Sequence, residues 1–199
     1  MALNNPYALR FDGVNDYVRV QLQNSFINNP SITGQMTVEF WAILQGGYYI
    51  LTSGSQAQAD GYRGISISYQ NGAKNLSVAD GTRVWSIAGA SMILNELHHY
   101  ALVWDGDLLY WLVDGVVTQE QSPISELRNR VNNYIDLGKP TTISSFFGHF
   151  DMDELRIWDH YRTPAQIQQN MYKTLTGTEP GLELYLRFDT GSGNIAVDS

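Results

Sequence analysis

The sequence lacks cysteine altogether, and its 199 residues include only 12 Lys and Arg against 20 Asp and Glu. Without thiols, thiolate catalysis and thiolate metal sites are excluded. Compartment is not decided by this absence, because a chain of this length can build a core without disulfides. The formal net charge of −8 argues against nucleic acid and anionic lipid as partners, since both repel an acidic protein. No hydrophobic run approaches the roughly 20 residues of a membrane span, so we expect no membrane insertion.

The first residues also lack the features of a targeting segment. Residues 1–6 read MALNNP, with neither a basic region nor a long apolar region. They do not predict a secretory signal peptide. A trimmed leader, another export route and a protein that stays inside the cell are the alternatives.

What the sequence does contain is a series of short apolar and β-branched runs separated by turn residues, which is typical of an all-β domain. Within 98–119, Asp114-Gly115 predicts a type I′ hairpin, because both central residues of that turn need a positive φ. The five Trp residues fall mostly on core positions of these runs. Strands are predicted at 7–11, 16–20, 36–44, 48–53, 63–69, 75–79, 82–87, 98–104, 108–113, 116–119, 146–158 and 182–188.

One helix is predicted near 164–172. Thr163 can cap its N-terminus, Pro164 fits the first helical position, and Gln166 has the spacing of a capping box. Ile167 and Met171 stand four residues apart, so both can face the rest of the domain. A weaker helical pattern covers 124–130.

Two segments near the ends of the chain carry its most specific pattern. Residues 8–20 read ALRFDGVNDYVRV, and residues 148–159 read GHFDMDELRIWD, followed by TPAQI at 163–167. Together they resemble the opening and closing signatures of laminin G-like domains in the concanavalin A-like lectin/glucanase superfamily. The resemblance implies a jelly-roll β-sandwich of two antiparallel sheets with one short C-terminal helix.

The resemblance also predicts how the chain is divided. Residues 1–180 are expected to form the laminin G-like sandwich. Residues 181–199 are expected to hold the final strand and the start of a linker, because GNIAVDS at 193–199 is similar to a phrase that often leads into another domain of such proteins. Neighbouring domains of a longer parent chain are therefore expected partners.

A structural calcium ion is a further expectation. Hard cations prefer carboxylate and carbonyl oxygens, and the loop that holds Asp12 and Asp16 supplies both. In the resembled family a calcium lies between this loop and an aspartate at the position of Asp153. The alternative is that Asp12 and Asp16 only shape an Asx turn, while Asp153 caps a backbone amide. A pentraxin-type ligand calcium site is not expected, because no carboxylate follows Leu137-Gly138.

Aromatic residues in predicted loops are candidates for ligand binding, because functional residues often lie on loops carried by a rigid scaffold. Sugars stack on aromatic rings and hydrogen-bond to amides and carboxylates. Phe146 and Phe147 lie in such a loop, although buried aromatics are normal in a sandwich core. The residues assigned to ligand binding are Tyr48, Tyr49, Asp60, Tyr62 and Arg63.

Catalysis is the alternative function. Retaining glucanases of the resembled superfamily use two carboxylates about 5–5.5 Å apart. The nearest candidate here is Asp151-x-Asp153-Glu154, in which strand alternation predicts that Glu154 points away from the two aspartates. Glu39 and Glu183 are isolated strand carboxylates, and the four histidines form no catalytic motif.

The sequence therefore predicts a non-catalytic module that recognises a glycan or an extracellular protein, in a larger extracellular or cell-surface protein. A glycoside hydrolase or lyase of the same fold and a structural spacer domain remain the alternatives.

Overall fold

Two antiparallel sheets stack face to face in the computed structural model, which describes residues 7–21, 35–53, 63–70, 73–80, 84–121, 134–140 and 145–189. The seven-stranded sheet runs in the order β1 (Leu9–Asp12), β12 (Gly148–Trp158), β3 (Met36–Gly47), β8 (Leu97–Trp104), β9 (Leu109–Val113) and β10 (Val116–Gln121), with β13 (Leu182–Leu186) also paired to β12. The six-stranded sheet runs in the order β2 (Val18–Gln21), β11 (Tyr134–Leu137), β4 (Tyr49–Ser53), β5 (Arg63–Gln70), β6 (Ala73–Asp80) and β7 (Val84–Ala88).

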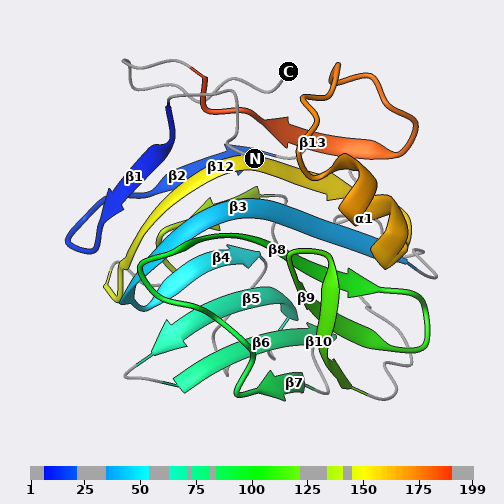
Figure 1. The fold of residues 1–199 in the computed structure, drawn as a ribbon. Helices are drawn as coiled ribbons and strands as arrows, with labels where there is room; N and C mark the ends of the chain where they lie inside the picture. The colour runs from blue at the N-terminus through cyan, green and yellow to red at the C-terminus, as the bar shows by residue number, and fades with distance from the viewer. Residues whose placement is uncertain are drawn as a thin grey trace.

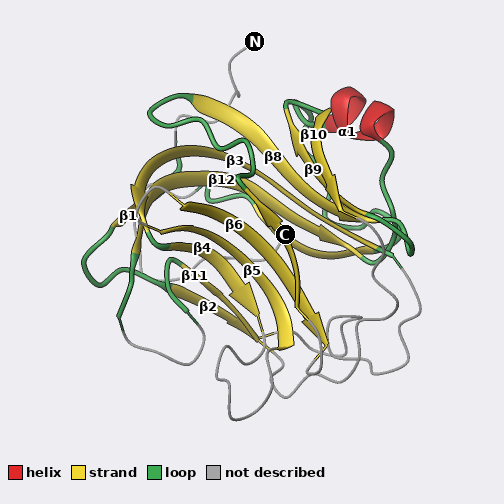
Figure 2. Ribbon diagram, turned by 90° about the horizontal axis from the view of Figure 1, so that it is seen from below, coloured by secondary structure: helices red, strands yellow, loops and turns green. Residues whose placement is uncertain are grey.

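The two layers are visible in both ribbon views (Figure 1; Figure 2). Seen from below, the six-stranded sheet forms the nearer layer, and the helix α1 (Pro164–Asn170) lies at the upper right beside β9 and β10 of the seven-stranded sheet. The prediction of a β-sandwich of two antiparallel sheets with one short C-terminal helix is therefore confirmed.

Alternation along each strand builds the core between the sheets. In β3, Val38 and Phe40 point into this core, whereas Glu39 and Trp41 lie on the outer face of the seven-stranded sheet. A second, smaller apolar cluster lies on that outer face, where Ile167 of α1 packs on Ala101 and Val103. The seven-stranded sheet is thus buried on both faces around α1.

The two signature segments pair with each other. β1 runs antiparallel to β12, with Phe11 opposite Phe150 and Asp12 opposite His149. The Phe11 and Phe150 rings stack with 4.4 Å between their centroids, and both side chains are buried. The signature is therefore specific because its two halves are neighbours in the sheet.

The predicted local features are present. Asp114 and Gly115 have φ values of 51° and 74°, as a type I′ turn requires. Thr163 accepts a hydrogen bond from the N–H of Gln166, and the Gln166 side chain accepts one from the N–H of Thr163, which completes the capping box. Four of the five tryptophans are buried, at 41, 104, 111 and 158; the Trp85 side chain and the helical pattern at 124–130 lie outside the described residues.

One strand was missed, and one sequence expectation was wrong. β11 was not predicted, because four residues are too short a run to show a clear period. Glu154 does not point away from its neighbours: β12 shifts register between Asp153 and Arg156, and Glu154 adopts φ 52°. This β-bulge interrupts the alternation and brings the Glu154 carboxylate to the outer face beside Arg156.

Candidate functional site

One end of the sandwich collects aromatic residues from three separate segments. Figure 1 shows the turn between β1 and β2, the connection from β3 to β4 and the start of β12 together at the left of the view. The rings there come from Tyr17, Tyr48, Tyr49, Phe146 and Phe147, and we call this set the aromatic end. Phe146 is 46% exposed and Tyr17 is 52% exposed, while the other three are half-buried.

Tyr48 and Phe146 form the centre of the aromatic end. Their rings meet edge to face with 5.0 Å between centroids and 68° between planes. The Tyr48 N–H donates to the Phe147 carbonyl over 3.1 Å, which fixes the two segments side by side. A partly exposed edge-to-face pair offers one ring face to a ligand while its partner holds it in place.

Close backbone approach makes this arrangement possible. Gly47 has φ 79°, and a side chain there would place its Cβ 2.5 Å from the His149 nitrogen. A Cβ at Gly148 would lie 2.2 Å from the Tyr49 carbonyl oxygen. Only glycine fits these two positions without displacing the backbone that carries the rings.

Lys139 adds a cation beside the aromatic end. It follows β11, and its Nζ lies 3.9 Å from the centroid of the Tyr17 ring. The N–H of Gly148 donates to the Gly138 carbonyl over 2.8 Å, which ties this segment to the start of β12. Sequence reasoning assigned no binding role to Tyr17 or Lys139; their pairing depends on the register of β2 against β11.

The structure describes only some of the side chains that the sequence assigned to ligand binding. The structure brings Tyr48 and Tyr49 to the aromatic end, next to Phe146 and Phe147. Asp60 and Tyr62 lie outside the described residues. Arg63 begins β5, and its side chain also lies outside the described residues.

The three carboxylates assigned to calcium do not come together. Asp12 accepts a hydrogen bond from the Val14 N–H over 2.8 Å, and Asp16 accepts one from the Asp12 N–H over 3.1 Å. Asp153 stands four positions beyond His149, the partner of Asp12, which is about 13 Å along the strand. Its Oδ1 accepts the Glu154 N–H over 2.9 Å. Among the described residues no group of three or more His, Asp or Glu side chains is placed to hold a metal ion.

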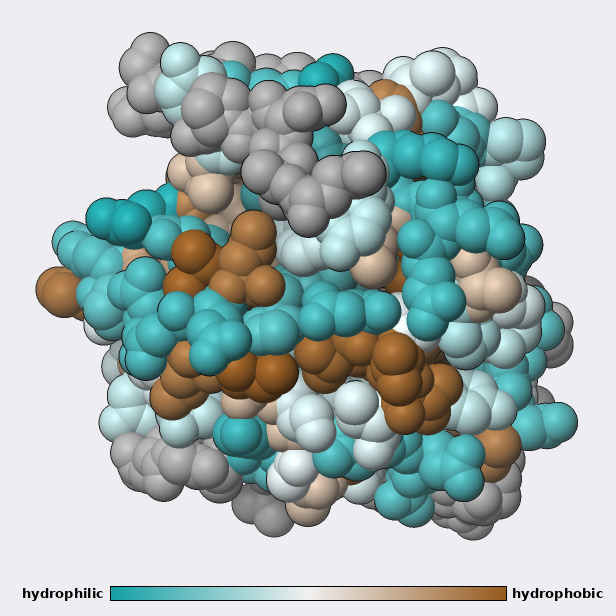
Figure 3. Space-filling model, in the orientation of Figure 1, coloured by the Kyte–Doolittle hydropathy of each residue, from teal (hydrophilic) through white to brown (hydrophobic). Residues whose placement is uncertain are grey.

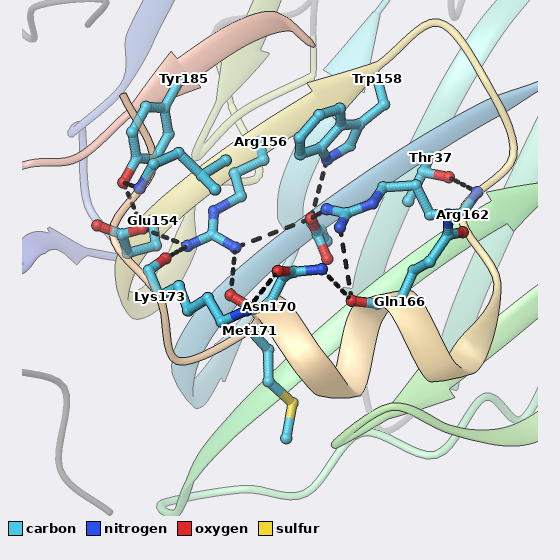
Figure 4. Close-up of polar contacts among 12 residues, drawn as sticks. Thr37, Glu154, Arg156, Trp158, Arg162, Gln166, Asn170, Met171, Lys173 and Tyr185 are labelled. Carbon is cyan, nitrogen blue, oxygen red and sulfur yellow. Dashed lines mark hydrogen bonds and ion pairs between the residues drawn. The ribbon is translucent and has the colours of Figure 1, made fainter. Parts of the chain in front are cut away.

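A buried polar cluster lies under α1, at the end of β12 that is distant from the aromatic end (Figure 4). Glu39 accepts hydrogen bonds from Arg162 Nη1 over 2.6 Å and Trp158 Nε1 over 2.8 Å. Glu154 accepts from Arg156 Nη2 over 2.5 Å and from the Tyr185 hydroxyl over 2.6 Å. These carboxylates are therefore held by guanidinium, indole and phenol donors.

Burial decides what this cluster can do. Glu39 is 0% exposed, Arg156 is 1% exposed and His99 is 1% exposed. Burial, together with the charges of Arg156 and Arg162, lowers the pKa of His99 to about 3, although Glu39 Oε2 lies only 3.6 Å from its ring. Burial also lowers the pKa of Arg162. A substrate could not reach these groups, so the cluster joins α1 to the sheet rather than forming an active site.

The remaining candidate carboxylates offer no catalytic pair. Asp151 forms a bidentate ion pair with Arg10, at 2.8 Å and 3.0 Å. Asp153 is only 4% exposed, and Glu183 is half-buried at the start of β13.

Comparison with known proteins places the chain in a family. Residues 12–168 match the model of the concanavalin A-like lectin/glucanases superfamily, so the chain belongs to that superfamily. No curated protein matches it in sequence.

Solved structures show the same fold at low sequence identity. A candidate carbohydrate-binding protein from Bacteroides ovatus ATCC 8483 is 18% identical, with a TM-score of 0.71, and the match covers 98% of this chain and 56% of that one. The botulinum neurotoxin serotype D binding domain is 16% identical, with a TM-score of 0.65 over 83% of this chain and 41% of that one. The serotype D ligand-binding domain in complex with N-acetylneuraminic acid is 17% identical, with a TM-score of 0.64 over 83% and 42%. The chain therefore spans about half the length of these structures.

The described residues contain no helix that is long and apolar enough to cross a membrane.

Proposed function

We propose that this chain is a non-catalytic carbohydrate-binding module, and that the aromatic end is its glycan site. The observation that carries the proposal is the edge-to-face pair of Tyr48 and Phe146, which leaves nearly half of the Phe146 surface exposed. The apolar face of a pyranose ring stacks on such a surface. The Asp16 carboxylate and the Tyr17 hydroxyl of the β1–β2 turn, at the same end of the sandwich, can bind the sugar hydroxyls.

The ligands of proteins with the same fold support this proposal. A binding domain that was solved with N-acetylneuraminic acid shares the fold, and so does a candidate carbohydrate-binding protein. The buried state of Glu39 and Glu154 supports a binding role rather than hydrolysis. We further propose that the module belongs to an extracellular or cell-surface protein, where glycans of this kind are displayed.

A glycan array with the purified chain tests the proposal. Binding that is retained by the unaltered chain and lost in Tyr48→Ala and Phe146→Ala variants with normal melting temperatures supports it. Absence of binding to every array member, or equal binding by the variants, contradicts it.

Calcium is a separate part of the proposal. An ion at the Asp12–Asp16 loop would take oxygens other than those of Asp153, because Asp153 lies too far along β12. A native-state ligand raises stability by mass action, so chelation would then lower the melting temperature. An unchanged melting curve after chelation removes calcium from the proposal.

Binding to a protein surface is the second candidate function. Figure 3 shows apolar side chains gathered in a band across the face of the molecule that is turned to the viewer. Among the exposed apolar side chains, Ile93 and Leu97 precede or begin β8, while Val116 and Val117 begin β10 and are 56% and 40% exposed. A neighbouring domain or an extracellular protein could cover these side chains. Loss of interdomain or partner binding in a Val116→Ser variant, with glycan binding intact, would favour this second function.

A further inference from the structure

Lys139 is a mostly buried cation with a fixed position. Only 9% of the residue is exposed, and its carbonyl accepts a hydrogen bond from Thr52 Oγ1 over 2.9 Å. The preceding Gly138 donates its N–H to the Ile50 carbonyl over 3.0 Å. Backbone and side-chain hydrogen bonds therefore hold this segment between β4 and the start of β12.

No counter-charge meets this cation in the described part of the chain. Its Nζ lies over the Tyr17 ring at 3.9 Å, and no hydrogen bond or ion pair of the described residues ends on that nitrogen. Arg10, Arg19 and Arg162 each contact a carboxylate within 3 Å. A ring face compensates for only part of the hydration free energy that an ammonium loses on burial.

The ammonium is nevertheless not fully enclosed. Arg156 Nε and His99 Nδ1 are fully enclosed and have no hydrogen-bond partner. Lys139 Nζ, in contrast, is not fully enclosed. Lys139 is thus mostly covered, and its ammonium lies beside Tyr17, a residue that is 52% exposed. An acceptor carried by a ligand at the aromatic end can approach it directly.

We propose that Lys139 binds an anionic substituent, a carboxylate or a sulfate, of the glycan that occupies the aromatic end; this inference rests on the proposed glycan-binding function. The hydrogen bonds between Gly148 and Gly138 and between Tyr48 and Phe147 place the cation and the ring pair on adjoining segments. A sugar ring on the aromatic surface can then direct a charged group to Lys139. The net charge of −8 opposes distant anions, so selection depends on this short-range contact.

Three lactose derivatives test the inference. We would measure calorimetric affinities of the full chain for lactose, 3′-sialyllactose and 3′-sulfolactose, which share one neutral core. We expect both anionic sugars, or the one whose charge fits, to bind about tenfold or more tightly than lactose, as a charge-assisted hydrogen bond provides. The comparison of the two anionic sugars separates carboxylate from sulfate.

A matched pair of variants assigns the effect to one residue. Lys139→Met keeps an apolar stem on Tyr17 and removes the charge, so it should abolish the preference for anionic sugars and leave the lactose affinity unchanged. Lys74→Met, on β6, is the control and should change neither affinity. Because the chain has only three lysines, dimethyl-lysine NMR signals provide an independent measurement: the Lys139 signal alone should shift with 3′-sialyllactose or 3′-sulfolactose.

The outcomes separate the two proposals. Equal binding of lactose and both anionic sugars would overturn the role of Lys139 and leave the glycan site standing. An anionic preference that survives in Lys139→Met would also overturn it. No binding of any of the three sugars, together with an empty glycan array, would contradict both proposals.

Discussion

Arg162 Nη1 lies 2.6 Å from Glu39 Oε1, although the two residues are 123 positions apart in the chain. Glu39 is on the central strand β3, and Arg162 directly precedes the N-cap of α1. The pair is buried and also contacts Trp158 through its indole N–H. The pair therefore fixes the helix to the sheet at a buried point. Water could not replace either side chain as the partner of the other.

Removing the carboxylate of this pair should destabilise the fold strongly. Glu39→Ala leaves the Arg162 and Arg156 guanidinium groups buried without their counter-charge, and we expect it to lower the free energy of unfolding by about 3–5 kcal/mol. Urea denaturation at pH 7 measures this loss. The control is Glu120→Ala on the exposed side of β10, which should change stability by no more than about 0.5 kcal/mol. Similar small effects in both variants would contradict a stabilising role of the pair.

The aromatic end predicts a selective loss of binding. Phe146→Ala removes the exposed ring of the Tyr48–Phe146 pair, so glycan affinity should fall by about tenfold, as expected for one aromatic contact. The melting temperature should stay within a few degrees of the original. Tyr172→Ala is the matched control, because Tyr172 is a 44% exposed aromatic beside α1, outside the proposed site. If both variants bind alike, the site is elsewhere.

Buried His99 predicts a particular dependence of stability on pH. Its pKa falls from an ordinary value near 6.5 to about 3 in the folded protein, chiefly because it is buried. Between these values the unfolded chain binds a proton that the folded chain does not, so stability falls as the pH drops below 6.5. The slope from this group is about 1.4 kcal/mol per pH unit.

His99→Gln, which cannot titrate, should remove this slope. We expect the loss of unfolding free energy between pH 6 and pH 4 to be smaller in His99→Gln than in the original protein, as measured by urea denaturation at each pH. A variant with the same pH profile would show that His99 does not titrate as its buried position predicts.

Gly138 and Gly89 form a matched pair for the cost of close approach. Both have positive φ, 83° and 71°, but a Cβ at Gly138 would lie 2.6 Å from the Phe11 ring, whereas a Cβ at Gly89 has open space. Gly89→Ala should cost about 1–2 kcal/mol of backbone strain. Gly138→Ala should cost at least about 1–3 kcal/mol more, because Phe11 has to move. Equal thermal stabilities of the two variants would contradict the tight packing of Gly138 on Phe11.

The local features of the fold could be predicted because each depends on neighbours in the sequence. Asp114-Gly115 satisfies the φ requirements of its own turn, and Thr163 with Gln166 completes a capping box within four residues. The period-two pattern of β3 was readable for the same reason. The short strand β11 was missed, because Ile135 and Leu137 can be recognised as strand residues only from their pairing with β2 and β4.

The candidate site was only partly predictable. Tyr48 and Tyr49 could be recognised as aromatics beside a glycine pair. The predicted calcium site required Asp12, Asp16 and Asp153 to lie close together, and the register of β1 on β12 keeps Asp153 apart from the other two. The bulge at Glu154 is another case: an extra residue in β12 changes which face its carboxylate occupies, and no local pattern marks it.

By itself, the sequence determined the class of fold, the type I′ hairpin and the capped helix, because alternation, turn chemistry and capping act over a few residues. Tertiary structure alone decided that Lys139 lies over Tyr17, that Phe146 meets Tyr48 and that Arg162 reaches Glu39. Each of these contacts joins segments that are distant in the chain, and their geometry is fixed by strand register and by how the two sheets pack.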